Sequence, residues 1–575
     1  MTDGVVAHPS GPTAHFGALA AQAAHLPAGD VRPKQRAEWR LIGTAAPRID
    51  AAAKSRGSAT FGIDVRQPGQ VYAAILHSPM LGGVPGAIDV APALALKGVE
   101  RVVRVRSYAG STEAVAVVGR STWHAQQGAR ALKVQWRQRP AGALDSAVIE
   151  RALADAAREG DGFVFHDRGD AAQALADGGR VIEALYQAPY VAHMTMEPVN
   201  CTARVADGRV EVWVPTQVPG MARAAAARAA GVDEAQVTVH VTYLGGGFGR
   251  RLEVDVVGQA VSVAMETGGR PVQLVWSREE DTTHDFYRPA GAAWMRAALD
   301  AQGRPTALSI TCAGDAITPR WMERGLPALA GPVDSPDRTA AEGLFGLPYG
   351  IPHQRIAQVA TRSGVPVGFW RAVGHSHHAF FSEGFVDELA HAAGADPVAW
   401  RLVLLQDMPR HAAVLKLAAD KAGWDTPAPA GRARGVALHE SFGSIVAQVV
   451  EASLDEGQPR VHRVVCAIDC GTVVNPGIVA QQMESAVIFG LSAALHGRID
   501  IDDGVVRQRN FPDQPILTLA RTPAIETHIV RSEHPPTGVG EPGTPPVAPA
   551  LAGALFALTG RRRRTLPLNL ADSVR

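Results

Sequence analysis

Hydrophobic periodicity divides the chain into short strands and helices. Apolar side chains alternate with polar ones from Val237 to Tyr243, which predicts a half-buried strand because successive strand residues point to opposite faces. A continuous apolar run at 115–118 predicts a strand that is buried on both faces. Segments rich in β-branched and aromatic residues predict further strands at 61–65, 71–76, 133–136, 212–214, 272–276 and 463–469.

Helical spacing appears between these strands. Phe381, Phe385 and Leu389 recur every four residues, which places them on one face of a helix. A proline near the start of segment 547–558 and Gly560 just beyond it match the residues that commonly bound a helix. Helices are also expected at 18–26, 122–132, 221–230 and 479–495.

The composition allows several large buried cores and excludes a strong overall charge. The chain has 575 residues, of which 46% are hydrophobic, and this length suggests about three to five lobes. Lys plus Arg and Asp plus Glu both number 56, so no net field attracts nucleic acid or an anionic membrane. The basic run at 561–564 is interpreted first as a solvated terminal face and second as a contact with a partner or ligand.

The four cysteines, Cys201, Cys312, Cys466 and Cys470, lack the spacing of an iron–sulfur or structural zinc site. We therefore expect neither on this chain. No apolar run approaches the roughly 20 residues that span a bilayer, so no membrane span is predicted. The N-terminus lacks the pattern of a signal peptide, which favours the cytoplasm for this chain alone and leaves export with a partner open.

The glycine-rich loop after the strand at 237–243 is a candidate ligand site. Consecutive glycines expose backbone N–H groups that can cradle a phosphate or a polar heterocycle, and Arg250 and Arg251 add positive charge. The spacing differs from that of the P-loop and of the dinucleotide-binding fingerprint. A purely structural turn is the alternative interpretation.

Glu541 stands alone between glycines and prolines, shortly before the predicted helix at 547–558. Glycine permits close approach of a ligand and proline stiffens the loop. Helix N-termini favour anions, so a carboxylate here suits a general base beside a bound group. An ordinary surface loop is the alternative.

A glycine-flanked turn places Arg371 directly after two aromatic residues, with His375, His377 and His378 close behind. Metal binding by these histidines is one hypothesis, although their spacing matches no standard zinc motif. Side chains on a helix face or against a partner are the favoured interpretation.

Two further clusters carry reactive side chains. Glu197, near His193, is interpreted either as a second active-site carboxylate or as part of a strand-end turn with a satisfied histidine. Cys470 follows Asp469 in a turn that could bind an anion, and it fits a small buried residue better than a nucleophile because no histidine partner is evident.

Taken in order, these motifs resemble the large, molybdopterin-binding subunit of the molybdenum hydroxylases, the xanthine dehydrogenase and aldehyde oxidoreductase superfamily. Within it they are most similar to the isoquinoline 1-oxidoreductase beta-subunit branch. No single motif is specific, but the ordered set is. The matching segments are 39–43, 48–50, 61–65, 193–198, 213–217, 245–251, 287–289, 370–371, 469–477 and 538–543.

The resemblance implies an α+β fold with an α/β hammerhead domain followed by two mixed α/β molybdopterin-binding lobes. After an N-terminal arm at 1–36, the hammerhead would occupy 37–145. The first lobe would occupy 146–430 and the second 431–575.

The resemblance also implies functional roles. The chain would belong to a multi-subunit oxidoreductase that hydroxylates N-heterocycles or oxidises aldehydes, with Glu541 as the general base at a molybdenum centre. A small [2Fe–2S] subunit would carry the iron–sulfur clusters, and no side chain of this chain is expected to ligate a metal. The cofactor would be molybdenum–molybdopterin in its cytosine dinucleotide form, contacted by Gly245, Gly246, Gly247, Phe248, Gly249, Arg250, Arg371, Cys470, Gly471, Asn475, Gly538, Val539 and Gly540.

Three departures from the family pattern change these expectations. Leu252 stands where xanthine-oxidising relatives carry a pocket glutamate, so purine recognition is not expected. Ser485 and Ala486 replace a glycine pair near the cofactor. A Gly-Gln-Gly cofactor segment is missing from its usual place between 405 and 435, so either a companion chain supplies it or the chain is a non-catalytic or truncated subunit that retains the fold.

Overall fold

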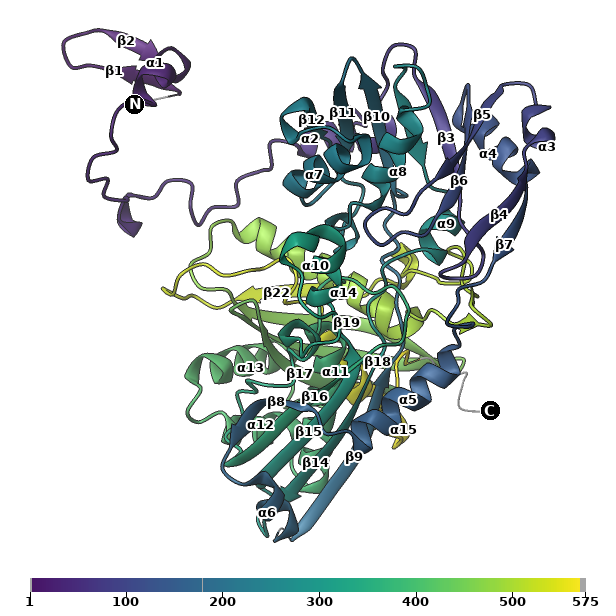
Figure 1. Ribbon diagram of the computed structural model, residues 1–575. Helices are drawn as coiled ribbons and strands as arrows, with labels where there is room; N and C mark the ends of the chain where they lie inside the picture. The colour runs from purple at the N-terminus through teal and green to yellow at the C-terminus, as the bar shows by residue number, and fades with distance from the viewer. Residues whose placement is uncertain (1–2, 178, 569–575) are drawn as a thin grey trace.

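Three larger β-sheets organise the computed structural model, which describes residues 3–177 and 179–568 (Figure 1). The first sheet has seven strands in the order β12-β11-β10-β13-β3-β6-β5. Its strands are β3 (Val71–Leu76), β5 (Val99–Val105), β6 (Ala114–Gly119), β10 (Asn200–Ala206), β11 (Arg209–Val214), β12 (Val237–Val241) and β13 (Val272–Val275).

This sheet joins strands from both sides of the domain boundary predicted at residue 145. β3 pairs in parallel with β13, and Val71 lies opposite Val272. The boundaries of the hammerhead and the lobes remain predictions, but the sheet itself crosses the predicted boundary at residue 145. The helices and the small ladder around it are α3 (Ala91–Leu94), α4 (Thr122–Ala131), α7 (Pro219–Ala230), α8 (Asp255–Ala264), β4 (Val84–Asp89) and β7 (Lys133–Arg137).

The second sheet has five strands in the order β8-β16-β15-β14-β9. They are β8 (Phe163–Arg168), β9 (Arg180–Ala188), β14 (Gly291–Leu299), β15 (Pro305–Asp315) and β16 (His353–Thr361). Two helices, α5 (Ser146–Glu159) and α6 (Ala171–Ala176), pack against β14 and β15. The short helix α9 (Arg278–Thr283) lies between β13 of the first sheet and β14, and α10 (Thr318–Gly325) lies between β15 and β16.

The third sheet has the order β17-β18-β19-β22 and supports the C-terminal helices. Its elements are β17 (Arg432–Ser441), β18 (Ser444–Asp455), β19 (Gln458–Asp469), β22 (Ala524–Ile529), α11 (His375–Ala392), α12 (Pro397–Leu404), α13 (Pro409–Ala422), α14 (Pro476–His496) and α15 (Val547–Thr559). β20 (Ile501–Asp502) and β21 (Val505–Val506) form a separate small ladder.

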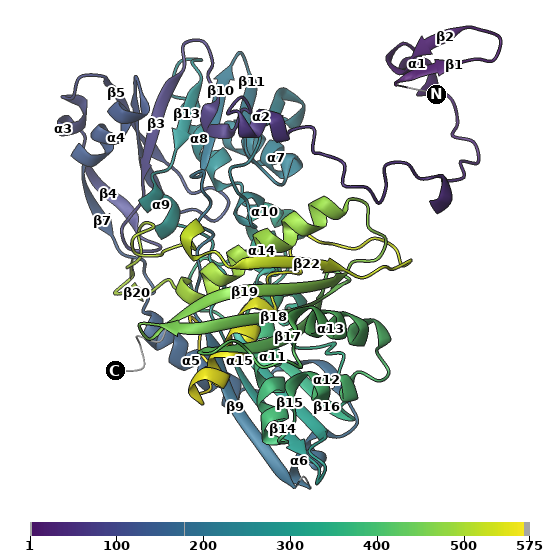
Figure 2. The ribbon, with the colours of Figure 1, turned by 180° about the vertical axis from the view of Figure 1, so that it is seen from behind.

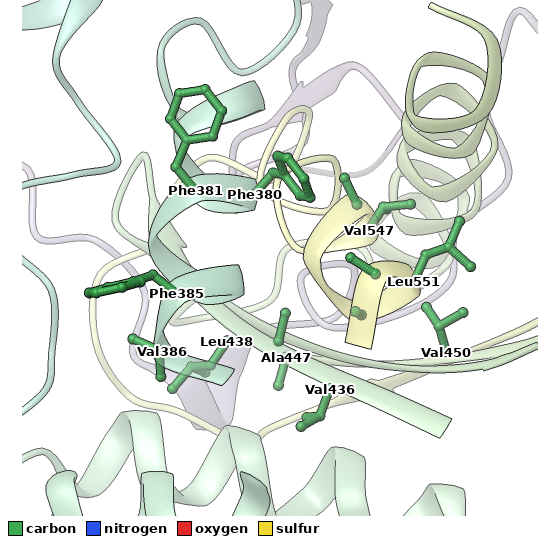
Figure 3. Close-up of a cluster of buried hydrophobic side chains, with 14 of the residues drawn as sticks. Phe380, Phe381, Phe385, Val386, Val436, Leu438, Ala447, Val450, Val547 and Leu551 are labelled. Atoms are coloured by element: carbon green, nitrogen blue, oxygen red, sulfur yellow. The ribbon is translucent and has the colours of Figure 1, made fainter. Parts of the chain in front are cut away.

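The main core lies between α11, α15 and the third sheet, where Phe385, Leu438 and Leu551 are fully or almost fully buried (Figure 3). α11 is buried on nearly all sides rather than on one face, because α15, α12 and two sheets surround it. Burying large apolar side chains supplies the main favourable term in folding. This core holds α11 in place. It therefore also positions Arg371, which lies four residues before His375, the first residue of α11.

The N-terminal segment lies apart from the body of the molecule. β1 (Val5–Ala7) pairs with β2 (Thr13–His15), and α1 (Phe16–Ala23) follows. An extended stretch then leads to α2 (Ala51–Ser55) beside the first sheet, as both views show (Figures 1 and 2).

Most of the predicted elements are confirmed, including the strand from Val237 and the helix that ends at Gly560, whose φ is 67°. The strand predicted at 61–65 is wrong. There the chain forms a 3₁₀ turn, η2 (Gly62–Asp64), because the Gln273 side chain donates to the carbonyl oxygens of Gly62 and Ile63.

One helix contradicts the expectation that no apolar segment is long enough to cross a membrane. α14 passes that test by length and composition. Its residues Met483, Val487 and Leu491 are buried, and the helix packs against β22 and α15, as expected for a core helix. The four cysteines are buried and free.

Candidate cofactor and active site

The glycines of the loop after β12 are required by close packing against the protein itself. A Cβ on Gly249, whose φ is 110°, would lie 1.8 Å from the Phe369 carbonyl oxygen. A Cβ on Gly245 would lie 2.3 Å from Glu197 Cβ. Between these glycines Phe248 adopts a left-handed φ of 54°, which is unusual for an aromatic residue and typical of positions held in place at functional sites.

Arg250 points away from the glycine loop and into the protein. Its guanidinium is 1% exposed, donates to both Asp255 carboxylate oxygens at 3.0 and 2.9 Å, and lies 3.2 Å from Asp285. A buried arginine needs such carboxylates to offset its desolvation. The Arg250 side chain therefore has a structural role, and a contact between this residue and the cofactor stays a prediction.

Arg371 connects three of the predicted cofactor segments. Its Nε donates to the Gly540 carbonyl oxygen at 3.0 Å, and its Nη1 donates to Ser485 Oγ at 3.0 Å. Its guanidinium also lies over the Phe248 ring, 6.0 Å from the centroid. Burial lowers the pKa of Arg371 to about 10, so the group stays positively charged at neutral pH.

Glu541 lies next to the turn that follows Arg371. Ala372 and Val373 have left-handed φ values of 71° and 48°, and the Ala372 backbone N–H interacts with the Glu541 carboxylate. Burial raises the pKa of Glu541, while this N–H and the Arg371 charge act in the opposite direction. The helix whose N-terminus was expected to stabilise this carboxylate, α15, starts six residues later, at Val547. The carboxylate instead lies at the turn before α11.

The loop from Gly538 to Gly540 is fixed from one side and open on the other. Ser444 Oγ donates to the Gly538 carbonyl oxygen at 2.6 Å, and the Thr537 N–H donates to the Cys470 carbonyl oxygen at 3.0 Å. In contrast, a Cβ on Gly540 would meet no atom within 4 Å, and its φ is not positive. No neighbour among the described residues requires glycine at that position, so an approaching ligand or cofactor fits there.

Cys470, Gly471 and Asn475 lie in a loop that adjoins this site through Thr537, and each has a structural partner. Burial raises the pKa of the Cys470 thiol, which argues against a nucleophile. A Cβ on Gly471 would lie 2.0 Å from the Pro535 carbonyl oxygen. Asn475 caps α14 by accepting from the Ile478 N–H at 3.1 Å, and Val539 packs in the apolar cluster with Cys470.

Glu197 and His193 are satisfied within the protein. Glu197 accepts from the N–H groups of Gly245 at 2.7 Å and Ile63 at 2.9 Å. His193 is hydrogen-bonded to Asp285 through Nδ1 and to the Phe369 carbonyl oxygen through Nε2 at 2.7 Å. These contacts support the interpretation of a strand-end turn over a second active-site carboxylate.

The described residues contain one group of three side chains that could hold a metal ion, His77, Glu280 and His284. Gln259 Oε1 accepts from Trp276 Nε1 at 3.1 Å, so Gln259 Nε2 donates to His77 Nε2 at 3.0 Å. The His77 proton therefore lies on Nδ1, 2.6 Å from Glu280. A metal-bound histidine instead donates from its outer nitrogen, so this group is a hydrogen-bonded cluster rather than a metal centre.

A cavity of about 330 Å³ is lined in part by the Phe248 ring. Phe489 of α14 stacks on Phe248 at 4.4 Å and on Trp370 at 4.7 Å, and all three line the cavity. The volume lies within the range of small-molecule pockets.

The sequence analysis missed Phe489 and Glu342. Phe489 has helical spacing but no motif around it, so only its place in α14 reveals its contacts. Glu342 lies between two alanines and a glycine, and burial together with Asp337 and Glu541 raises its pKa to about 8. A lone glutamate in such a segment carries no signal that could have marked it.

Comparisons with known proteins define the family. Two models, both described as molybdopterin cofactor-binding domain, match residues 156–404 and 399–523. The beta subunit of isoquinoline 1-oxidoreductase from Brevundimonas diminuta is 33% identical over 583 residues, which cover 97% of this chain and 72% of the relative. This chain belongs to the molybdenum hydroxylase family, in its isoquinoline 1-oxidoreductase branch.

Other relatives agree with this assignment to a family of molybdenum oxidoreductases. One nicotinate dehydrogenase subunit from Pseudomonas putida is 30% identical, and the match covers 100% of this chain and 50% of that protein. The crystal structure of quinoline 2-oxidoreductase from Pseudomonas putida 86 superposes with a TM-score of 0.75 at 17% identity, covering 92% of this chain and 97% of that one. The α+β fold expected for the molybdenum hydroxylase subunit is thereby confirmed.

Proposed function

We propose that this chain is the catalytic molybdopterin-binding subunit of a complex that hydroxylates N-heterocycles or oxidises aldehydes. The observation that carries the proposal is the junction of Arg371, Gly540 and Glu541, which places an ionisable carboxyl group beside a fixed positive charge and an open backbone. The names of the isoquinoline and nicotinate relatives support an N-heterocycle as substrate.

The residues present fit a large anionic cofactor. Open backbone at Gly540, the guanidinium of Arg371 and the glycine loop at 245–249 would hold molybdenum–molybdopterin, in our proposal as its cytosine dinucleotide. When bound, this group supplies the two-electron redox chemistry, while the protein supplies position, charge and a base. We propose that a small [2Fe–2S] subunit carries the electrons away, and that a companion chain supplies the Gly-Gln-Gly segment.

Glu541 would act as the general base. A base works best when its pKa approaches the working pH, and burial raises the pKa of Glu541 in that direction. The Arg371 charge and the Ala372 N–H keep the carboxylate available as a proton acceptor. The carbon next to a heterocyclic nitrogen and the carbonyl carbon of an aldehyde are both electron-poor, so one base can serve either substrate.

The two residues that replace family glycines are accommodated. Ser485 accepts a hydrogen bond from Arg371. Ala486 packs against Gly543, because a Cβ added to Gly543 would lie 2.8 Å from the Ala486 Cβ. Neither side chain blocks the contact between Arg371 and Gly540. This observation favours the catalytic subunit over the alternative of a non-catalytic or truncated subunit.

The test is co-purification of the chain with its [2Fe–2S] and companion subunits, followed by molybdenum and nucleotide analysis and by assays with isoquinoline, quinoline and benzaldehyde. We expect about one molybdenum and one cytosine nucleotide per chain and turnover of at least one compound. A complete complex without molybdenum would support the non-catalytic alternative instead.

A further inference from the structure

The cavity of about 330 Å³ that Phe248 helps to line has walls of aromatic and apolar side chains. Trp370, Phe489 and Phe248 form one part of these walls, and the Phe489 ring stacks on both of the other rings. The lining residues of α14 recur at helical spacing and so share one face of that helix: Ser485, Ile488, Phe489, Ser492 and Ala493. The cavity therefore offers an apolar contact surface to a ring system.

The mouth of the cavity lies where two of its apolar lining residues are exposed. Met196 is 67% exposed and Ile516 is 36% exposed. Met194 also lines the cavity and is held with a left-handed φ of 51°. Methionine side chains adapt to irregular partners and make favourable contacts with aromatic rings. These residues give a flat aromatic molecule an apolar entrance.

Three of the polar lining side chains are already hydrogen-bonded within the protein. His193 uses both of its ring nitrogens. Ser492 Oγ donates to a carbonyl oxygen of its own helix at 2.8 Å and accepts from the Leu517 N–H at 3.0 Å. Ser485 Oγ accepts from Arg371. These contacts hold the walls in place and leave little hydrogen-bonding capacity for a ligand.

Gln514 differs from these three side chains. It lines the cavity, it is 3% exposed, and its Oε1 has no hydrogen-bond partner among residues 3–177 and 179–568. Its backbone N–H donates to the Asn510 carbonyl oxygen at 3.0 Å, and Pro515 stiffens the chain that follows. A buried carboxamide oxygen without a partner is unfavourable, so a bound molecule that donates a hydrogen bond to it would gain affinity.

We propose that this cavity binds a flat aromatic lactam, with the Gln514 carboxamide as its polar partner. The cis amide of a lactam ring presents an N–H and a carbonyl oxygen side by side. A carboxamide offers the complementary acceptor and donor in one plane. An N-heterocycle that is hydroxylated at the carbon next to its nitrogen takes this lactam form, because the hydroxyl proton moves to the ring nitrogen.

The inference rests on the proposed function for the source of the lactam, but binding can be measured without turnover. The acceptor at Gln514 separates the product of the proposed reaction from its substrate. Isoquinoline has no ring proton to donate, so it would leave Oε1 unpaired, whereas isoquinolin-1-one would pair it. The N-methyl derivative of this lactam keeps the ring system and the carbonyl oxygen but loses the N–H. A site that pairs with an N–H discriminates against analogues that lack it.

The test is calorimetric titration of the purified complex with isoquinolin-1-one. We expect saturable binding of this lactam, and about tenfold weaker binding of its N-methyl derivative and of isoquinoline. Gln514→Leu should weaken lactam binding about tenfold and remove the preference over the N-methyl derivative. The matched control is Gln302→Leu, at an exposed position in the turn between β14 and β15, which should change neither.

Ala493→Leu is the second variant, because its larger side chain would fill the cavity from α14. It should abolish the lactam binding seen in wild type, with its unfolding midpoint in denaturant as the check that the fold persists. Lactam affinity that is unchanged in Gln514→Leu, or in a folded Ala493→Leu, would overturn the inference. A complex with turnover but without saturable lactam binding would refute the inference alone. Lactam binding in a complete complex without turnover would refute the proposed function alone.

Discussion

Arg371 donates from Nε to the carbonyl oxygen of Gly540 at 3.0 Å, although the two residues lie 169 positions apart in the sequence. This bond joins the turn before α11 to the loop that carries Glu541. The same guanidinium holds Ser485 of α14 and lies over the Phe248 ring. One charged side chain therefore links the loop that carries Glu541 to the glycine loop.

Replacing Glu541 by Gln should leave the cofactor bound and remove nearly all turnover. The amide keeps the shape of the side chain but cannot accept the proton, and loss of a general base costs about 100-fold or more. Molybdenum content and kcat measured on the same preparation test this, with Glu533→Gln, on an exposed loop, as the control. Turnover within about tenfold of wild type would show that another group is the base.

Replacing Arg371 by Lys should weaken both the fold and the cofactor site. Lysine cannot reproduce the simultaneous hydrogen bonds to Gly540 and Ser485, and each bond from a charged donor contributes about 1.5–3 kcal/mol. We expect a lower unfolding midpoint in denaturant and a lower molybdenum content. Arg561→Lys, at an exposed position, should change neither. An unchanged midpoint in Arg371→Lys would contradict the connecting role of this side chain.

Two glycine-to-alanine changes should separate structural glycines from ligand-facing ones. Gly249→Ala should destabilise the fold severely, because its Cβ would lie 1.8 Å from the Phe369 carbonyl oxygen. Gly540→Ala meets open space and should fold normally, yet bind less cofactor. Thermal unfolding and pterin analysis of both variants test the contrast. Normal cofactor content in Gly540→Ala would show that nothing approaches this backbone.

Acid should destabilise the protein through its buried histidines. Burial lowers the folded-state pKa of His375 and of His378 to about 4, whereas the unfolded chain takes up these protons near pH 6.5. The unfolded state therefore binds more protons between those values, so the free energy of unfolding should fall as the pH drops from about 6.5 to about 4. Denaturant midpoints across this range should fall less steeply in His375→Gln than in His25→Gln, whose histidine is exposed.

The sequence predicted the parts of this molecule that depend on local pattern. The alternation from Val237 and the proline and glycine that bound α15 act within a few residues, so they could be recognised directly. The 3₁₀ turn at Gly62 was missed because Gln273, 211 residues away, determines it.

The candidate site was predicted only in part for the same reason. Arg371 and Glu541 stood out through unusual neighbours, but the partners that define their roles come from distant segments. Arg250 looked like a free cation in the sequence, and only the fold shows Asp285 beside it. Glu342 gave no signal because its raised pKa depends first on burial, which only the fold reveals.

The parallel pairing of β3 with β13 limits how this protein can be divided or recombined. A fragment that stopped at residue 145 would leave the backbone edge of β3 without its neighbour, and bare strand edges promote aggregation. Hybrid enzymes that exchange the N-terminal region between homologues should therefore transfer residues 71–275 together, with crossover points outside that interval.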